Sequence, residues 1–238
     1  MLGLLLSSCN LQTLRKGKAM NISDLENKII NADCLDILKQ LPDKCIDLVL
    51  TDPPYGIGIK GSVGGGSKRG KVKDCKKCNW DEFIPSKEYF DEIFRVSKNQ
   101  IIWGGNYFVE SLKNSRCFLC WYKRDGLPER TFADAELAWT SFDKNAKVYN
   151  IRHDGFIRDS KEPQELHPTQ KPLKLFEKCV ADFSQEGDLI LDCFSGSGTT
   201  AIACHNLKRR FICIEKDFDY WKASVERLKE HQRQGVLF

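Results

Sequence analysis

The stretch LILDCFSGSGTT, residues 189–200, decides the fold class, because it reads as a buried strand, a glycine turn and the start of a helix. Gly196 and Gly198 permit a tight turn and the close approach of a ligand to the backbone, near the positively polarised helix N-terminus. The next strand ends at Glu215, 23 residues after Asp192. A dinucleotide-binding fold places an acid there against ribose hydroxyls, so this segment predicts a nucleotide-type site.

Strand and helix patterns alternate along the rest of the chain. Residues 46–51 form a continuous apolar run, as expected for a parallel strand that is covered on both faces. Alternation of this kind predicts an α/β fold with a mostly parallel central sheet, to which we add one antiparallel edge strand. Further strands are expected at 28–33, 100–103, 117–123, 136–142 and 211–215, and helices at 34–41, 87–95, 171–183, from about 199 and from 220.

Composition excludes several classes of protein. A chain of 238 residues suits one α/β domain, and no apolar run is long enough to span a bilayer. The net charge of +4 does not by itself indicate a nucleic-acid partner, because positive charge must be clustered to bind one. The eleven cysteines are scattered through apolar runs, which favours buried thiols in a reducing, cytoplasmic compartment over a disulfide framework.

The N-terminal residues look different from the rest. Residues 1–19 begin with a short apolar stretch, and the basic residues follow it, which is the reverse of an export signal. Met20 stands immediately before the patterned region. We therefore expect residues 1–19 to be a disordered extension or a mis-assigned start, and residues 20–238 to form a single domain.

A second motif, Asp52-Pro-Pro-Tyr55, follows the strand at 46–51, where two prolines force the chain to leave the sheet. A third, His-Pro-Thr-Gln-Lys-Pro, occupies 167–172. With the glycine turn last in the order, these motifs resemble the β group of amino-methylating DNA methyltransferases, which modify adenine N6 or cytosine N4. The resemblance covers about residues 28–230. It implies a Rossmann-like methyltransferase fold, S-adenosylmethionine as cofactor, double-stranded DNA as substrate, and a homodimer or a cognate restriction endonuclease as candidate partners.

The chemistry of that reaction explains the residues of the second motif. An exocyclic amine is a poor nucleophile because its lone pair is delocalised into the ring. The carboxylate of Asp52 and the carbonyl of Pro53 can accept hydrogen bonds from its two N–H groups, which favours a pyramidal nitrogen. Pro53 and Pro54 fix φ and so present these acceptors rigidly. Tyr55 offers an aromatic face to a base flipped out of the duplex, and a base–aromatic stack contributes about 1–3 kcal/mol.

The cofactor contacts are implied by the resemblance. Asp33, after the first strand, would bond the adenine amine of the cofactor. His167, Thr169 and Lys171 would hold its methionine end, with Lys171 pairing the carboxylate. The residues expected to line the amino-acid and ribose portions are Asp192, Phe194, Ser195, Gly196, Ser197, Gly198, Thr199 and Glu215.

The target base and the class of substrate leave alternatives open. In the family, Asp at the first position of the second motif is associated mainly with adenine and Ser with cytosine N4, so Asp52 favours adenine. A cytosine C5 enzyme is excluded, because it would need a Pro-Cys pair and the sequence has none. The remaining alternatives are a methyltransferase acting on RNA or on a protein amide, and a non-enzymatic module that only binds DNA.

Two segments are expected to contact DNA. The basic, glycine-rich loop at 57–79 follows the second motif, and its Lys68, Arg69, Lys71 and Lys73 can neutralise phosphates. Residues 124–165 are the expected target-recognition region, in which Arg130, Arg152 and Arg158 are candidates to read bases.

Two Cys-x-x-Cys pairs, 75/78 and 117/120, could together suggest a zinc site. The second pair lies in an expected strand, where positions three apart point to opposite faces. We therefore expect no metal.

Overall fold

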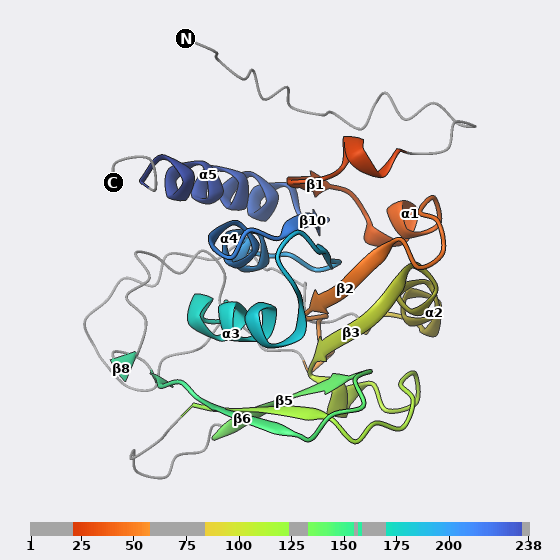
Figure 1. The fold of residues 1–238 in the computed structure, drawn as a ribbon, viewed down its shortest axis with the longest axis vertical. Coiled ribbons are helices and arrows are strands. Elements are labelled where there is room, and N and C mark those ends of the chain that lie inside the picture. The colour runs from red at the N-terminus through yellow and green to blue at the C-terminus, as the bar shows by residue number, and fades with distance from the viewer. Residues whose placement is uncertain (1–20, 58–83, 124–132, 155–156, 159–169, 235–238) are drawn as a thin grey trace.

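The computed structural model describes residues 21–57, 84–123, 133–154, 157–158 and 170–234 (Figure 1). Its main feature is an eight-stranded sheet with the strand order β1-β10-β9-β2-β3-β5-β4-β6. In that order the strands are Lys28–Asn31, Arg210–Glu215, Leu189–Asp192, Ile46–Thr51, Ser97–Trp103, Ala135–Thr140, Phe118–Tyr122 and Lys147–Asn150. A separate two-stranded ribbon pairs β7 (His153–Asp154) with β8 (Ile157–Arg158).

Strand direction confirms the expected mostly parallel sheet and corrects the position of its antiparallel strand. All neighbouring pairs are parallel except those that β5 makes with β3 and β4. We predicted an antiparallel strand at the edge, but β5 lies between β3 and β4 and the edge strand is β6. The prediction failed because β6 is short and mostly exposed, so its sequence, KVYN, lacks the apolar pattern of a strand.

The helices differ in how many of their faces are buried. In α2 (Lys87–Val96), the buried residues Tyr89, Phe90, Ile93 and Val96 make one face. In α4 (Thr199–Asn206), six consecutive residues from Thr199 are buried, because this helix is covered on several sides. The other helices are α1 (Cys34–Leu38), α3 (Leu173–Phe183) and α5 (Phe218–Gln234), and 3-10 turns occupy Ile22–Asp24 and Gly105–Tyr107.

The helices cover the sheet on two faces (Figure 1). The core on one face joins residues of α3, α4 and α5 to the sheet, and the core on the other joins residues of α1 and α2 to it. Fully buried strand residues such as Leu48 and Val49 point to opposite faces, which explains why the strand at 46–51 is apolar throughout. No helix in the described ranges has the length and apolarity needed to cross a membrane.

Parallel strands bring their carboxyl ends to one edge of the sheet, and ligand sites of open α/β sheets lie at such an edge. At this edge Glu215 ends β10, Asp192 ends β9 and Asp52 follows β2. Because β5 runs in the opposite direction, its second residue, Glu136, arrives at the same edge.

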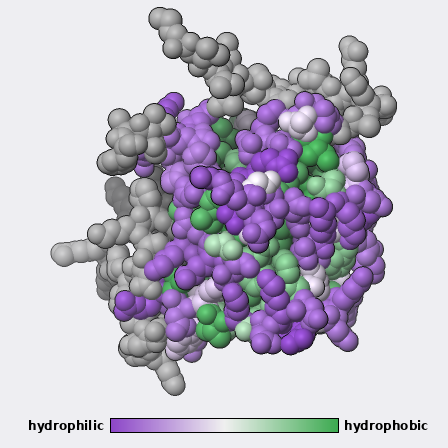
Figure 2. Space-filling model, in the orientation of Figure 1, coloured by the Kyte–Doolittle hydropathy of each residue, from purple (hydrophilic) through white to green (hydrophobic). Residues whose placement is uncertain are grey.

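The face seen in Figure 2 is mostly hydrophilic, with hydrophobic residues exposed in smaller areas between the polar ones.

Candidate active site

The turn after β2 presents an acid and an aromatic ring together. The hydroxyl of Tyr55 donates a hydrogen bond to Asp52 Oδ1 at 2.6 Å. The Tyr55 ring stacks on Tyr107, with centroids 4.8 Å apart and planes 16° apart. Gly104 has a φ of +67° and lies against Tyr55, where an added Cβ would stand 2.0 Å from Cε1 of the ring. The ring position therefore depends on the absence of a side chain at residue 104.

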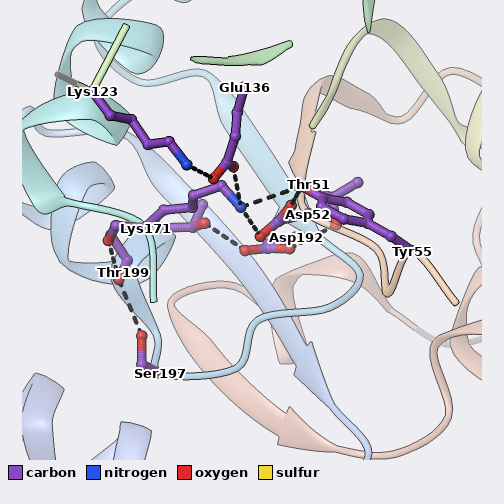
Figure 3. A network of polar contacts seen from close by, with 10 residues as sticks. Thr51, Asp52, Tyr55, Lys123, Glu136, Lys171, Asp192, Ser197 and Thr199 are labelled. Carbon is purple, nitrogen blue, oxygen red and sulfur yellow. Dashed lines mark hydrogen bonds and ion pairs between the residues drawn. The ribbon is translucent and has the colours of Figure 1, made fainter. Parts of the chain in front are cut away.

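Four charged side chains form a chain of alternating sign beside this turn (Figure 3). The ammonium of Lys171 donates to Asp52 Oδ2 at 2.5 Å and lies 3.1 Å from Glu136 Oε2. The ammonium of Lys123 donates to Glu136 Oε1 at 2.8 Å. Lys171 is only 7% exposed, so its charge is neutralised by these carboxylates and not by water. It also lies 3.3 Å from the Tyr55 hydroxyl oxygen.

Burial and charge act against each other in this group. Burial raises the pKa of Asp52, although the Lys171 ammonium opposes that rise. Burial also raises the pKa of Glu136, but Lys171 and Lys123 outweigh it and bring that pKa down to about 2. Burial disfavours a charged Lys171, but Asp52 and Glu136 outweigh it, so the pKa of Lys171 lies well above its usual range. Lys171 thus lies between two carboxylates, and Lys123 lies on the far side of Glu136.

The glycine turn between β9 and α4 is built from backbone. Gly196 and Gly198 have φ values of +50° and +77°, which favour glycine. Glu215 accepts hydrogen bonds from the backbone N–H of Gly196 and Asp217, both at 2.8 Å. The N-terminus of α4 faces the turn at Thr199, and Gly198 is its N-cap. Burial raises the pKa of Glu215, and its backbone donors oppose that rise.

A guanidinium from the C-terminal helix supports the same turn. Arg227 Nη1 donates to the carbonyl oxygen of Ser197 at 3.0 Å and lies 3.1 Å from Thr199 Oγ1 and 3.2 Å from Ser197 Oγ. The Ser197 and Thr199 hydroxyls lie 3.2 Å apart, and both side chains are buried. Ser195 is also buried and donates its backbone N–H to Ile214. Thus α5 fixes the shape of a turn that lies far from it in sequence.

Asp192 connects the two turns. One of its oxygens accepts from the Thr51 hydroxyl at 2.8 Å and from the Phe194 N–H at 3.1 Å, and the other accepts from the Thr200 hydroxyl at 2.5 Å. Thr51 immediately precedes Asp52, so the turn after β2 and the glycine turn share one buried carboxylate. Burial raises the pKa of Asp192 to about 6, against the effect of its three donors.

Asp33, after β1, is held by three donors. It is the N-cap of α1 and accepts from the Leu35 N–H at 3.0 Å, from the Tyr89 hydroxyl at 3.0 Å and from Lys216 at 2.9 Å. Burial raises its pKa, but Lys216 and the other donors outweigh burial and lower it. The Tyr89 ring lies 6.2 Å from the ring of Phe194, so an acid and two aromatic rings lie near each other beside the glycine turn.

The structure therefore brings most of the expected residues to one edge of the sheet. The ammonium of Lys171, which we expected to pair with the carboxylate of the cofactor, contacts Asp52. The backbone oxygen of Lys171 lies 3.5 Å from the Thr199 hydroxyl of the glycine turn. Arg152 is exposed and follows β6 at the same edge, because its neighbours Ile151 and His153 donate backbone N–H groups to Tyr122 and Lys123. Arg158 belongs to β8, and its side chain is not described. The residues outside the described part of the chain are His167, Thr169, Lys68, Arg69, Lys71, Lys73 and Arg130.

Sequence reasoning missed Glu136, Lys123, Tyr107 and Arg227. Glu136 carried one signal, a charged residue at an inward position of a strand, because it shares a sheet face with Trp121. The others had no local signal. In the second Cys-x-x-Cys pair, Cys117 is buried and Cys120 is half-buried, while residues 75 and 78 lie outside the described residues. Within the described ranges, no group of three or more potential metal ligands is found.

Comparison with known proteins identifies the family. The family model N6_N4_Mtase, described as DNA methylase, matches residues 98–226, more than half of the chain. The Type II methyltransferase M.HinfI of Haemophilus influenzae is 27% identical over 256 residues, which cover 88% of this chain and 70% of M.HinfI. The Type II methyltransferase M2.DpnII of Streptococcus pneumoniae is 27% identical over 241 residues, which cover 84% and 89% of the two chains.

A solved structure agrees with that result. The crystal structure of an M1.HpyAVI–SAM complex matches with a TM-score of 0.54 and 26% identity, covering 84% of this chain and 99% of the other. The sheet order, the glycine turn and the acidic turn beside it define an α/β protein of the methyltransferase fold. Within that class, the chain belongs to the DNA methylase family whose members modify exocyclic N6 or N4 amines.

Proposed function

We propose that this protein transfers the methyl group of S-adenosylmethionine to N6 of adenine in duplex DNA. The observation that carries the proposal is the Asp52–Tyr55 pair, which lies beside the glycine turn and is joined to it through Thr51 and Asp192. Family membership supports the general reaction, and both curated relatives are Type II methyltransferases. The identity of Asp52 supports adenine.

The residues around the glycine turn fit the cofactor by their chemistry. Glu215 and Asp33 are carboxylates that can accept hydrogen bonds from ribose hydroxyls and an adenine amine, and Phe194 offers an aromatic face. Gly196 and Gly198 leave the backbone accessible to a ligand near the N-terminus of α4. The remaining contacts proposed are Asp192, Ser195, Ser197, Thr199, His167, Thr169 and Lys171. When bound, S-adenosylmethionine supplies an electrophilic methyl group.

The residues of the catalytic turn act on the target amine. The carboxylate of Asp52 and the carbonyl oxygen of Pro53 accept the two N–H groups and so direct the nitrogen lone pair out of the ring plane. Pro53 and Pro54 hold these acceptors, and Tyr55 stacks on the flipped base. As the amine gains a methyl group it loses one proton, and Asp52 is placed to accept it. Burial raises the pKa of Asp52, which makes it a better proton acceptor.

The DNA contacts and the domain plan remain part of the proposal. We assign one domain to residues 20–238, phosphate contacts to Lys68, Arg69, Lys71 and Lys73, and base reading to Arg130, Arg152 and Arg158. Exposed Arg152 lies at the same sheet edge as Asp52, which supports this assignment. Each lysine or arginine that contacts a phosphate should contribute about 0.9 to the slope of log K against log salt. Alanine at the four loop positions should flatten that slope, and an unchanged slope would remove them from the interface.

The experiment that tests the target base identifies the methylated nucleoside directly. The protein is incubated with labelled S-adenosylmethionine and duplex DNA of high sequence diversity, and the methylated nucleoside is identified by mass spectrometry. We expect N6-methyladenine. N4-methylcytosine as the only product would assign the enzyme to the other branch of the same family. Parallel reactions with RNA and with protein extracts separate the two remaining substrate classes.

A further inference from the structure

Glu136 reaches the catalytic turn through the direction of β5. It is the second residue of this strand and pairs with Trp121 of β4, and Lys123, two residues after Trp121, directly follows the end of β4 on the same sheet face. In a parallel strand, the second residue would lie at the opposite edge of the sheet. The antiparallel position of β5 between β3 and β4 therefore delivers one carboxylate to the active site that no sequence motif contains.

Among the described residues, the ion-pair partners of the Glu136 carboxylate are two lysines. One oxygen accepts from Lys123 at 2.8 Å, and the other lies 3.1 Å from the ammonium of Lys171. Lys171 also donates to Asp52, so a single buried ammonium is shared by two carboxylates (Figure 3). The described titratable groups that face Lys171 are Asp52, Tyr55 and Glu136, with Lys123 behind Glu136.

We propose that Glu136 is a positioning residue for methyl transfer, which keeps Lys171 positively charged throughout the reaction and so holds the carboxylate of Asp52 in place. This proposal rests on the proposed function. It gives β5 a role that follows from its reversed direction in the sheet.

The charge changes during the reaction give Glu136 this role. The N–C bond to the methyl group forms, the C–S bond of the cofactor breaks, and the surplus proton of the amine passes to a carboxylate oxygen of Asp52. Asp52 is then neutral, and Glu136 is the carboxylate that remains beside the 7% exposed ammonium among the described residues. Glu136 stays ionised because Lys171 and Lys123 hold its pKa at about 2. Neither Glu136 nor Lys171 gives up or gains a proton.

The test variant is Glu136→Gln, which keeps the size of the side chain and removes its charge. An opposite charge within hydrogen-bonding distance shifts a pKa by about 1–3 units, so the pKa of Lys171 should fall by about that amount. The rate of single-turnover methyl transfer should then begin to fall at a lower alkaline pH than in wild type. At neutral pH cofactor affinity should stay within about twofold, since Lys171 keeps its charge there and the described ion-pair partners of Glu136 are Lys123 and Lys171, outside the glycine turn.

A second variant and a matched control separate positioning from mere structural support. Lys123→Met leaves Glu136 in place but removes a charge that lowers its pKa, so the pKa of Glu136, followed by NMR in protein labelled with 13C at glutamate Cδ, should rise. Glu186→Gln removes an exposed carboxylate paired with Lys208 at the surface and should leave the alkaline limb unchanged. A slow Glu136→Gln enzyme with the wild-type pH profile, or Lys123→Met with an unchanged Glu136 pKa, would overturn the proposal.

A measurement without turnover tests the role of Glu136 separately from the proposed methylation of DNA. In protein labelled with 13C at lysine Cε, the Lys171 resonance, assigned by its absence in Lys171→Arg, is titrated by NMR without DNA. We expect its midpoint to fall by about 1–3 pH units in Glu136→Gln. An unchanged midpoint contradicts the role of Glu136 even if methylation occurs. A shifted midpoint in a protein that methylates no DNA would leave the electrostatic coupling established and contradict the proposed function alone.

Discussion

The two turns of the site are built in different ways. The glycine turn at 193–198 is contiguous in sequence, and its geometry comes from left-handed glycines and from backbone N–H groups that bind Glu215. The catalytic turn at 52–55 is held by side chains from three other segments, which supply Lys171, Glu136 and Tyr107. The first turn forms a fixed surface for a ligand. The second depends on charges and ring contacts that must form together.

This difference predicts different effects for substitutions in the two turns. A change in the glycine turn acts on the backbone, so it should affect cofactor binding and stability together. A change in the catalytic group should slow methyl transfer while the cofactor still binds. Asp192 is the exception, because it contacts both turns through Thr51 and Phe194.

The largest expected effect is that of Asp52→Asn. The amide keeps the shape of the side chain but loses the anionic acceptor for the amine and its proton, so the single-turnover rate should fall by about 10²–10³-fold or more. Cofactor affinity, measured by calorimetry, should hardly change, because the Asp52 side chain bonds to Tyr55 and Lys171 and not to the glycine turn. Loss of cofactor binding in this variant would contradict the separate roles that we give to the two turns.

Gly104→Ala should disturb the catalytic turn through its aromatic ring. The new Cβ would stand 2.0 Å from Tyr55 Cε1, so the ring must move away from its place on Tyr107. Base stacking contributes about 1–3 kcal/mol, and a displaced ring should weaken DNA binding by a similar amount. Titration of a duplex that carries a fluorescent base at the target position measures the affinity for DNA. If cofactor affinity falls as much as DNA affinity, the Tyr55 ring does not act on DNA binding alone.

Gly198→Ala should disturb the other turn, and Gly187→Ala is its matched control. Both glycines have a left-handed φ, so each substitution should cost about 1–2 kcal/mol of folding free energy, measured by urea unfolding. At Gly198 the new Cβ would also lie 3.1 Å from Ser224 Cβ, whereas at Gly187 nothing lies within 4 Å. Only Gly198→Ala should therefore weaken cofactor binding. Equal affinities in the two variants would speak against a ligand at the glycine turn.

The last expected effect is a pH dependence of stability from Asp192. Its pKa of about 6 lies above the unfolded value, so the folded state binds the proton more tightly and this contribution is complete below about pH 4. It is lost as pH rises towards 6 and beyond, in total about 3 kcal/mol. Asp192→Asn removes it, so the variant should gain stability relative to wild type between pH 4 and 7 in urea unfolding. A difference that does not vary with pH would contradict the raised pKa.

The sequence allowed the parallel sheet, both turns and their positions to be predicted, because each depends on local periodicity or on a contiguous motif. Leu189–Asp192 was predicted to the residue. Two of the features that could not be predicted show why. Strand β6 has mostly exposed residues, and Glu136 reaches Lys171 only through the antiparallel register of β5 with β4. Both follow from long-range strand pairing, which leaves no periodic signal in the residues themselves.

The most direct test of the central claim compares wild type and Asp52→Asn side by side. Each is mixed with isotopically labelled S-adenosylmethionine and duplex DNA, and both bound cofactor and labelled nucleosides are quantified. The account predicts equal cofactor binding, N6-methyladenine in the wild-type reaction and at most a trace with the variant. Equal methylation by the two proteins, or no methylated DNA from a wild-type protein that binds the cofactor, would contradict it.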